Sequence, residues 1–232
     1  MCTADYRGMR LRAKAILGLV HLDAWLALFT LWPGGTFAYW QAWVFLAVFT
    51  ACALAITVWL MKHDPALLER RTKVGPVAEA DASQKLIQSI ASLAFLALFV
   101  VSGLDHRCGW TQVPMPLVVL GDLLVALGLY LVLRVFAENT FTSATIETAP
   151  EQRVISTGPY ALVRHPMYVG ALVMLSGVPL ALGSVVGLVV LVPMTLAIMA
   201  RAIAEERFLD AHLPGYAGYR GRVRYRFVPR VW

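Results

Sequence analysis

The sequence has few charged residues and few cysteines. Charged side chains make up 15% of the 232 residues, against about 25% in an average soluble domain. This scarcity excludes a disordered chain, a coiled coil and most soluble α/β enzymes. The three cysteines are far apart, so we expect neither a disulfide framework nor a metal site built on them. The five histidines are scattered too, and no pair has metal-ligand spacing.

Apolar residues are in excess instead, at 59% of the chain. Four apolar runs approach the ~20 residues that a helix needs to cross a bilayer, namely 14–32, 38–61, 86–104 and 117–136. Two shorter stretches, 167–182 and 184–200, flank Gly183 and are interpreted as a helical hairpin. The prediction is an all-α, polytopic membrane helix bundle with four long transmembrane helices and a C-terminal helical hairpin. We expect one membrane domain over 1–232, with the four helices in 1–136 and the hairpin and basic tail in 137–232.

The placement of basic residues predicts the orientation. They gather in the N-terminal segment, in the second and fourth connections, and in the tail, which holds seven arginines from Arg201 onward. The positive-inside rule places these segments, and therefore both termini, in the cytoplasm. That parity requires 167–200 to enter the membrane and return, so that the segment before the hairpin meets the tail. Because these arginines adjoin membrane helices, the net charge of +6 indicates lipid headgroups rather than nucleic acid.

Two prolines predict where short helical elements begin ahead of the hairpin. Pro159 suits the first position of a helical turn, with Thr157 or Gly158 as its cap. Pro166 disfavours the helical conformation at His165, so a new helix should start there.

Arg164 and His165 would then lie at a helix N-terminus, which offers unpaired N–H groups and a partial positive charge. Such a site suits a carboxylate or a phosphate. The same residues are equally compatible with Arg164 anchoring to lipid phosphate and His165 capping the helix.

Two adjacent glutamates end the last apolar helix, and helical spacing separates their faces. Glu206 lies on one face with Ala202 and Leu209, whereas Glu205 lies with Arg201. Glu205 is compatible with an exposed ion pair. Glu206 is a carboxylate on the apolar side near the membrane, where ionisable groups are costly and usually functional. It could accept two hydrogen bonds from the diol of a ribose, or bind an amine.

The tail alternates basic and aromatic residues up to Pro229. Most of its arginines suit an anchor in the headgroup zone. Tyr219 and Arg222 could instead fold back over the hairpin.

Together these motifs resemble the superfamily of isoprenylcysteine carboxyl methyltransferases and phospholipid methyltransferases, integral membrane enzymes that use S-adenosylmethionine. The resemblance covers about 137–232, and the loop 63–71 is similar too. It implies a cofactor site at the cytoplasmic face, in a loop before the hairpin and in the hairpin itself. The residues that it implies for cofactor binding are Asn139, Gly158, Tyr160, Arg164, His165, Tyr168, Glu205 and Glu206. Tyr219, Arg222 and Phe141 are implied at the acceptor, and the candidate catalytic residues are His165, Glu206 and Tyr160.

The resemblance and the residues suggest one mechanism. The methionyl carboxylate would lie near Arg164 and His165, and Glu206, with Glu205 as second choice, would bind the ribose or amino group. No metal is needed. Apolar access favours a membrane lipid or lipidated acceptor, and we expect a phospholipid headgroup amine of the phosphatidylethanolamine type. The alternatives are an isoprenylcysteine carboxylate, an NADPH-dependent enzyme like the sterol reductases, and a non-enzymatic scaffold.

Overall fold

The computed structural model describes residues 2–71, 82–142 and 152–232, with the backbone alone for 2–7. Over these ranges the chain is helical and contains no strand. The helices are α1 (Cys2–Gly34), α2 (Trp40–His63), α3 (Pro65–Arg71), α4 (Ala82–Cys108), α5 (Met115–Glu138), a 3₁₀ helix (Gly158–Ala161), α6 (Pro166–Ala181), α7 (Gly187–His212) and α8 (Tyr216–Arg222). Among them α1, α2, α4, α5 and α7 are long and apolar enough to cross a membrane. The predicted all-α polytopic bundle is confirmed.

The hairpin differs from the prediction in its second arm. The first arm, α6, has 16 residues and is short, as expected. The second arm, α7, has 26 residues and begins at Gly187 rather than at residue 184. The polar residues that follow the apolar run, including both glutamates, are helical as predicted, and the helix ends at His212. The turn between the arms contains Gly183 with φ +72°, a backbone conformation that favours glycine.

Glycines bring α5 and α6 into direct backbone contact. A Cβ atom added to Gly121 would lie 2.2 Å from the backbone nitrogen of Ala181. One added to Gly128 would lie 2.4 Å from the backbone nitrogen of Met174. Small residues permit this close approach between membrane helices. The contact fixes the start of α6 beside the end of α5, where most of the predicted site residues lie.

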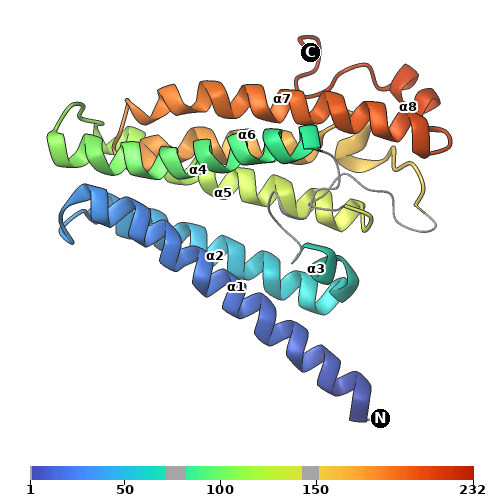
Figure 1. The fold of residues 1–232 in the computed structure, drawn as a ribbon, viewed down its shortest axis with the longest axis horizontal. Helices are drawn as coiled ribbons and strands as arrows, with labels where there is room; N and C mark the ends of the chain where they lie inside the picture. The colour runs from blue at the N-terminus through green and yellow to red at the C-terminus, as the bar shows by residue number, and fades with distance from the viewer. Residues whose placement is uncertain (1, 72–81, 143–151) are drawn as a thin grey trace.

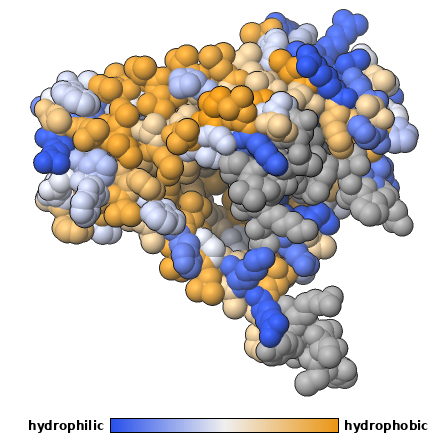
Figure 2. All heavy atoms as spheres, viewed as in Figure 1, coloured by the Kyte–Doolittle hydropathy of each residue, from blue (hydrophilic) through white to orange (hydrophobic). Residues whose placement is uncertain are grey.

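The two ends of the bundle differ (Figure 1). The α1–α2, α4–α5 and α6–α7 turns lie at one end, and α3, α8 and the described residues between α5 and α6 lie at the other. Apolar side chains cover the long helices in Figure 2, and hydrophilic ones gather towards the two ends. We call the end that carries α3 and α8 the site end, and the other the turn end.

A buried carboxylate joins two connections at the turn end. Asp105, at the end of α4, is fully buried. It accepts hydrogen bonds from the backbone N–H of Thr111 at 2.7 Å and from its hydroxyl at 2.5 Å. The Ser184 hydroxyl donates to it at 2.6 Å. Because Thr111 precedes α5 and Ser184 lies between α6 and α7, this cluster fixes the hairpin to the α4–α5 turn.

Candidate active site

The tail returns to the start of α6 and pairs with it through the backbone. The Arg164 N–H donates to the Tyr225 carbonyl at 2.9 Å, and the His165 N–H donates to the Arg226 carbonyl at 3.0 Å. The prediction that the segment before the hairpin meets the tail is confirmed. Pro166 is the first residue of α6, also as predicted.

These bonds alter the expected anion site at the start of α6. The amides of Arg164 and His165 already donate to the tail, and Pro166 has no N–H. Beyond Met167, the N–H groups of Tyr168 and Val169 donate to the His165 carbonyl at 3.1 and 3.2 Å. The row of open N–H groups expected at this helix N-terminus is therefore largely used within the protein, and anion binding has to depend on side chains.

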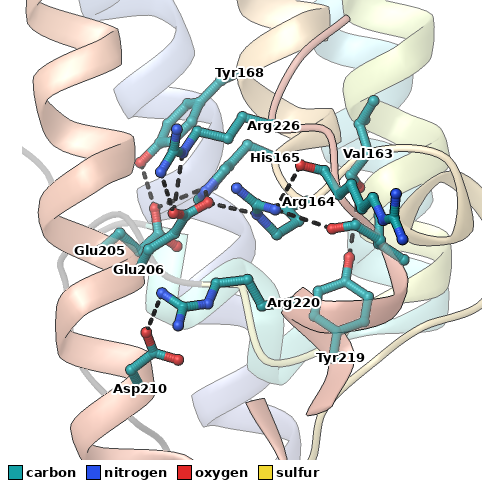
Figure 3. Close-up of polar contacts among 12 residues, drawn as sticks. Val163, Arg164, His165, Tyr168, Glu205, Glu206, Asp210, Tyr219, Arg220 and Arg226 are labelled. Carbon is teal, nitrogen blue, oxygen red and sulfur yellow. Dashed lines mark hydrogen bonds and ion pairs between the residues drawn. The ribbon is translucent and has the colours of Figure 1, made fainter. Parts of the chain in front are cut away.

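Glu206 connects α7, the start of α6 and the tail (Figure 3). One of its oxygens accepts from Nε of Arg164 at 2.6 Å and lies 3.2 Å from Nε2 of His165. The other accepts from Arg226, whose Nε and terminal nitrogen both lie at 3.0 Å. Glu206 is 3% exposed, so these contacts compensate for burying its charge.

Arg164 completes this polar core. Besides its bond to Glu206, one terminal nitrogen donates to the carbonyls of Val223 at 3.0 Å and Arg224 at 2.8 Å. Arg164 is buried, and its guanidinium holds the tail against α6 and α7. We call Arg164, His165, Glu206 and Arg226 the tail cluster.

Glu205 points to a different environment. The Tyr168 hydroxyl donates to it at 2.7 Å, and Nδ1 of His165 lies 3.8 Å from the same oxygen. Its side chain is 32% exposed, compared with 4% for that of Glu206. The predicted separation of the two faces is confirmed, with Glu206 on the buried one.

A cavity of about 290 Å³ lies at the site end, near the lower limit for small-molecule pockets. The predicted residues that line it are Asn139, Phe141, Tyr160, Arg164, His165, Tyr168, Glu205 and Tyr219. Gly158, Glu206 and Arg222 are not among its lining residues. The arrangement therefore favours Glu205 over Glu206 as the carboxylate that meets a ligand, the reverse of the expected order.

Asn139 orients the phenol of Tyr160. The Asn139 oxygen accepts from the Phe141 N–H at 2.9 Å, so its amide nitrogen is the group that donates to the Tyr160 hydroxyl at 3.0 Å. Burial raises the pKa of Tyr160 above its ordinary value. Tyr160 is therefore a neutral phenol, so this candidate catalytic residue is suited to donate a hydrogen bond rather than to accept a proton.

Tyr219 closes one side of the cavity, as expected. Its hydroxyl donates to the Tyr160 carbonyl at 2.8 Å, and burial raises its pKa to about 12. Arg222 is exposed and does not reach the cavity, so the structure does not bring it to the predicted position. A spacing of three residues normally puts two side chains on the same face of a helix, but Arg222 is the last residue of α8 and lies exposed, whereas Tyr219 is buried.

Gly158 has a local structural requirement. Its φ is +55°, and an added Cβ would lie 2.6 Å from a carboxylate oxygen of Glu138. Thr157 precedes the 3₁₀ helix but makes no side-chain cap, and its hydroxyl donates to Glu138 instead. Gly158 thus shapes the segment that positions Tyr160.

Sequence analysis did not predict three arginines of the cavity wall, Arg71, Arg153 and Arg201, as site residues. It placed Arg201 on one helix face with Glu205, but interpreted Glu205 as compatible with an exposed ion pair rather than as part of a cavity. No sequence pattern near Arg71, at the end of α3, predicts that it lines the cavity, because only the folding of the chain brings α3 to this wall. In the described parts of the chain, no group of three or more His, Cys, Asp and Glu side chains has an arrangement suited to a metal ion.

The fold and the cavity define a polytopic helical membrane protein with a charged site at one end of its bundle. Residues 116–214 match the family model described as phospholipid methyltransferase. The match confirms the predicted resemblance to the membrane methyltransferases. It extends from α5 through α7 and includes Tyr160, Arg164, His165 and both glutamates. A comparison with curated proteins found no match to this chain.

Proposed function

We propose that the protein is an S-adenosylmethionine-dependent membrane methyltransferase that acts on a phospholipid headgroup amine. The observation that carries the proposal is the cavity itself, which combines the Glu205 carboxylate, guanidinium groups and phenols beside membrane-spanning helices. Most of its wall comes from the segment similar to phospholipid methyltransferases. Within this proposal the site end and both termini face the cytoplasm.

The side chains of the cavity fit the chemistry of the cofactor. S-adenosylmethionine contains a carboxylate, an ammonium group, a ribose diol and an aromatic base. Arg201 is complementary to the carboxylate, and Glu205 to the ammonium group or the diol. The rings of Tyr168 and Phe208 offer faces for the base or for a cation. When bound, the cofactor would supply a methyl group on a positively charged sulfur.

Glu205 and Glu206 have separate roles in this proposal. Glu205 binds the cofactor, held by the Tyr168 hydroxyl at 2.7 Å. Glu206 positions Arg164 and His165 without touching the ligand, because its oxygens already accept from three side chains.

His165 would take the proton that an amine has to lose before its nitrogen lone pair can react. The ionised Glu206 only accepts hydrogen bonds, so the adjacent Nε2 of His165 carries the ring hydrogen. Nδ1 then keeps its lone pair, on the side of Glu205. Nδ1 would accept the proton of the headgroup ammonium first, which frees the nitrogen lone pair to take the methyl group that the cofactor, when bound, would supply. The wall residues contribute orientation and exclusion of water.

Binding measurements test the class of protein first. The detergent-purified chain is titrated with S-adenosylhomocysteine and, separately, with NADPH. We expect binding of the former alone. Binding of NADPH alone would support a sterol-reductase-like enzyme, and binding of neither would support a scaffold.

Methyl transfer then tests the acceptor. With a radiolabelled methyl donor, phosphatidylethanolamine should gain label and a farnesylated cysteine should not. Substitution His165→Gln should reduce transfer to the amine much more than it reduces S-adenosylhomocysteine affinity. Label on the farnesylated cysteine alone would replace the amine with a carboxylate acceptor, which needs no base.

A further inference from the structure

Four arginines belong to the described lining of the cavity, namely Arg71, Arg153, Arg164 and Arg201. Arg164 forms an ion pair with Glu206, and Arg153 is exposed. Arg71 and Arg201 line the same cavity as the Glu205 carboxylate. A guanidinium group in a cavity wall is suited to hold an anionic group of a ligand, such as a carboxylate or a phosphate.

Arg71 is held firmly in this wall. It ends α3, whose Leu67 and Leu68 are buried and whose first turn is capped by Asp64, which accepts from the Leu67 N–H at 2.8 Å. The Arg71 guanidinium lies 5.1 Å from the ring centre of Phe136, in a cation–π contact. Burial lowers the pKa of Arg71 from its ordinary value, and the nearby charge of Arg201 lowers it further.

Further contacts join α3 to the segment that positions Tyr160. The Thr140 hydroxyl donates to Asp64, and Arg70 donates to the Thr140 carbonyl. Thr140 directly follows Asn139, which orients Tyr160. Arg71 is therefore fixed relative to the same wall as the proposed cofactor site.

Arg71 and Arg201 differ in where they come from. Arg201 belongs to the matched segment 116–214, which would carry the chemistry common to the family. Arg71 lies outside that segment, on a short helix directly after the end of the α2 span. This is the depth at which lipid headgroups lie. Arg71 is thus placed to contact an acceptor in the membrane, and Arg201 to contact the cofactor.

We propose that Arg71 binds the phosphate group of the acceptor lipid and so determines the enzyme's preference for a phospholipid. A guanidinium offers two parallel N–H donors that match two phosphate oxygens. With the phosphate at Arg71, the headgroup amine extends into the cavity towards His165 and Glu205. The identity of the acceptor rests on the proposed function, whereas the phosphate site can be tested by binding alone.

The experiment uses the full chain in detergent and two short-chain lipids. Calorimetry measures the affinity for dihexanoyl phosphatidylethanolamine and for dihexanoyl glycerol, which lacks the phosphate and its headgroup. S-adenosylhomocysteine affinity is measured on the same samples. The original chain should bind the phospholipid at least tenfold more tightly than the glycerol lipid. Arg71→Gln should lose this preference and keep its S-adenosylhomocysteine affinity within about twofold, and Arg71→Lys should keep part of the preference.

The control is Lys62→Gln, which removes one exposed positive charge at the end of α2. It should retain the full preference, so a loss there would indicate general attraction to the protein surface. An unchanged preference in Arg71→Gln would overturn the proposal. So would a weaker S-adenosylhomocysteine affinity with an unchanged lipid preference, because Arg71 would then bind the cofactor. If the original chain bound no S-adenosylhomocysteine, the proposed function would be wrong. The measured preference for the phospholipid over the glycerol lipid would still show whether Arg71 binds the phosphate.

Discussion

Substituting each of the two neighbouring glutamates of α7 with glutamine should affect a different property. The change at position 206 should lower the stability of the fold, and the change at position 205 should weaken ligand binding. Glutamine keeps the size of the side chain and removes its charge. At position 206 it leaves Arg164, His165 and Arg226 around a neutral amide in a buried place. Breaking a buried ion pair by changing one partner costs about 3–5 kcal/mol. Glu206→Gln should therefore lower the thermal unfolding midpoint strongly.

At position 205 the effect should fall on ligand binding. The Glu205 side chain is 32% exposed and accepts one hydrogen bond from Tyr168, so its loss affects the fold little. If Glu205 binds the cofactor, the lost charge-assisted hydrogen bond is worth about 1.5–3 kcal/mol, or roughly a ten- to a hundredfold weaker affinity. Thermal melting and S-adenosylhomocysteine calorimetry on both variants give the comparison.

One pattern of results would refute this reasoning. If Glu206→Gln melted like the original chain and lost affinity, Glu206 would be a direct ligand and the tail cluster would not stabilise the fold. If Glu205→Gln kept full affinity, the cavity-facing carboxylate would have no part in binding. The double variant adds a check, because effects on stability and on affinity should then appear together.

Three further predictions concern packing, pH and orientation. Gly128→Ala should lower the unfolding midpoint by several degrees because its Cβ would meet the α6 backbone at 2.4 Å, whereas Gly18→Ala, with open space around it, should not. Burial raises the pKa of Tyr219 to about 12, above roughly 10 in an unfolded chain; its stabilisation should thus be complete below about pH 10 and decline as pH rises towards 12. Tyr219→Phe should remove that part of the pH dependence of melting. Cysteines introduced at Gly35 and Ala217 should be labelled from opposite sides of the membrane, and labelling from one side would refute the predicted orientation.

The membrane helices could be predicted from the sequence because each corresponds to a long run of apolar residues. A run such as 38–61 has to become a helix to satisfy its backbone in lipid. Composition alone does not reach the end of α7, where Arg201 and the glutamates are polar; their place on this helix was predicted from residue spacing instead, and the structure confirms it. Hydropathy marks where the hydrocarbon ends, and this helix continues beyond it to carry the site.

Helical spacing predicted which site residues share a helix face, but it did not predict contacts between distant segments of the chain. The 3.6-residue period correctly put Glu206 on the buried face of α7. It carried no information on what fills that buried space, which is Arg226 from the returning tail. For the same reason Arg71 was missed, since its place in the wall depends on the packing of α3 against Phe136. Such contacts between distant segments are set by the folded chain.

The pairing of the tail with Arg164 and His165 has a consequence for the order of biosynthesis. Residues 223–226 follow every membrane-spanning helix in the chain, so they leave the ribosome after α7. Until they dock, the carbonyls that hold Arg164 and the guanidinium that holds Glu206 are absent from the site. Membrane insertion and assembly of the cavity are therefore separate events. A chain that stops after α8 would have every helix of the bundle in place, yet its cavity would lack the segment that fixes its charged wall.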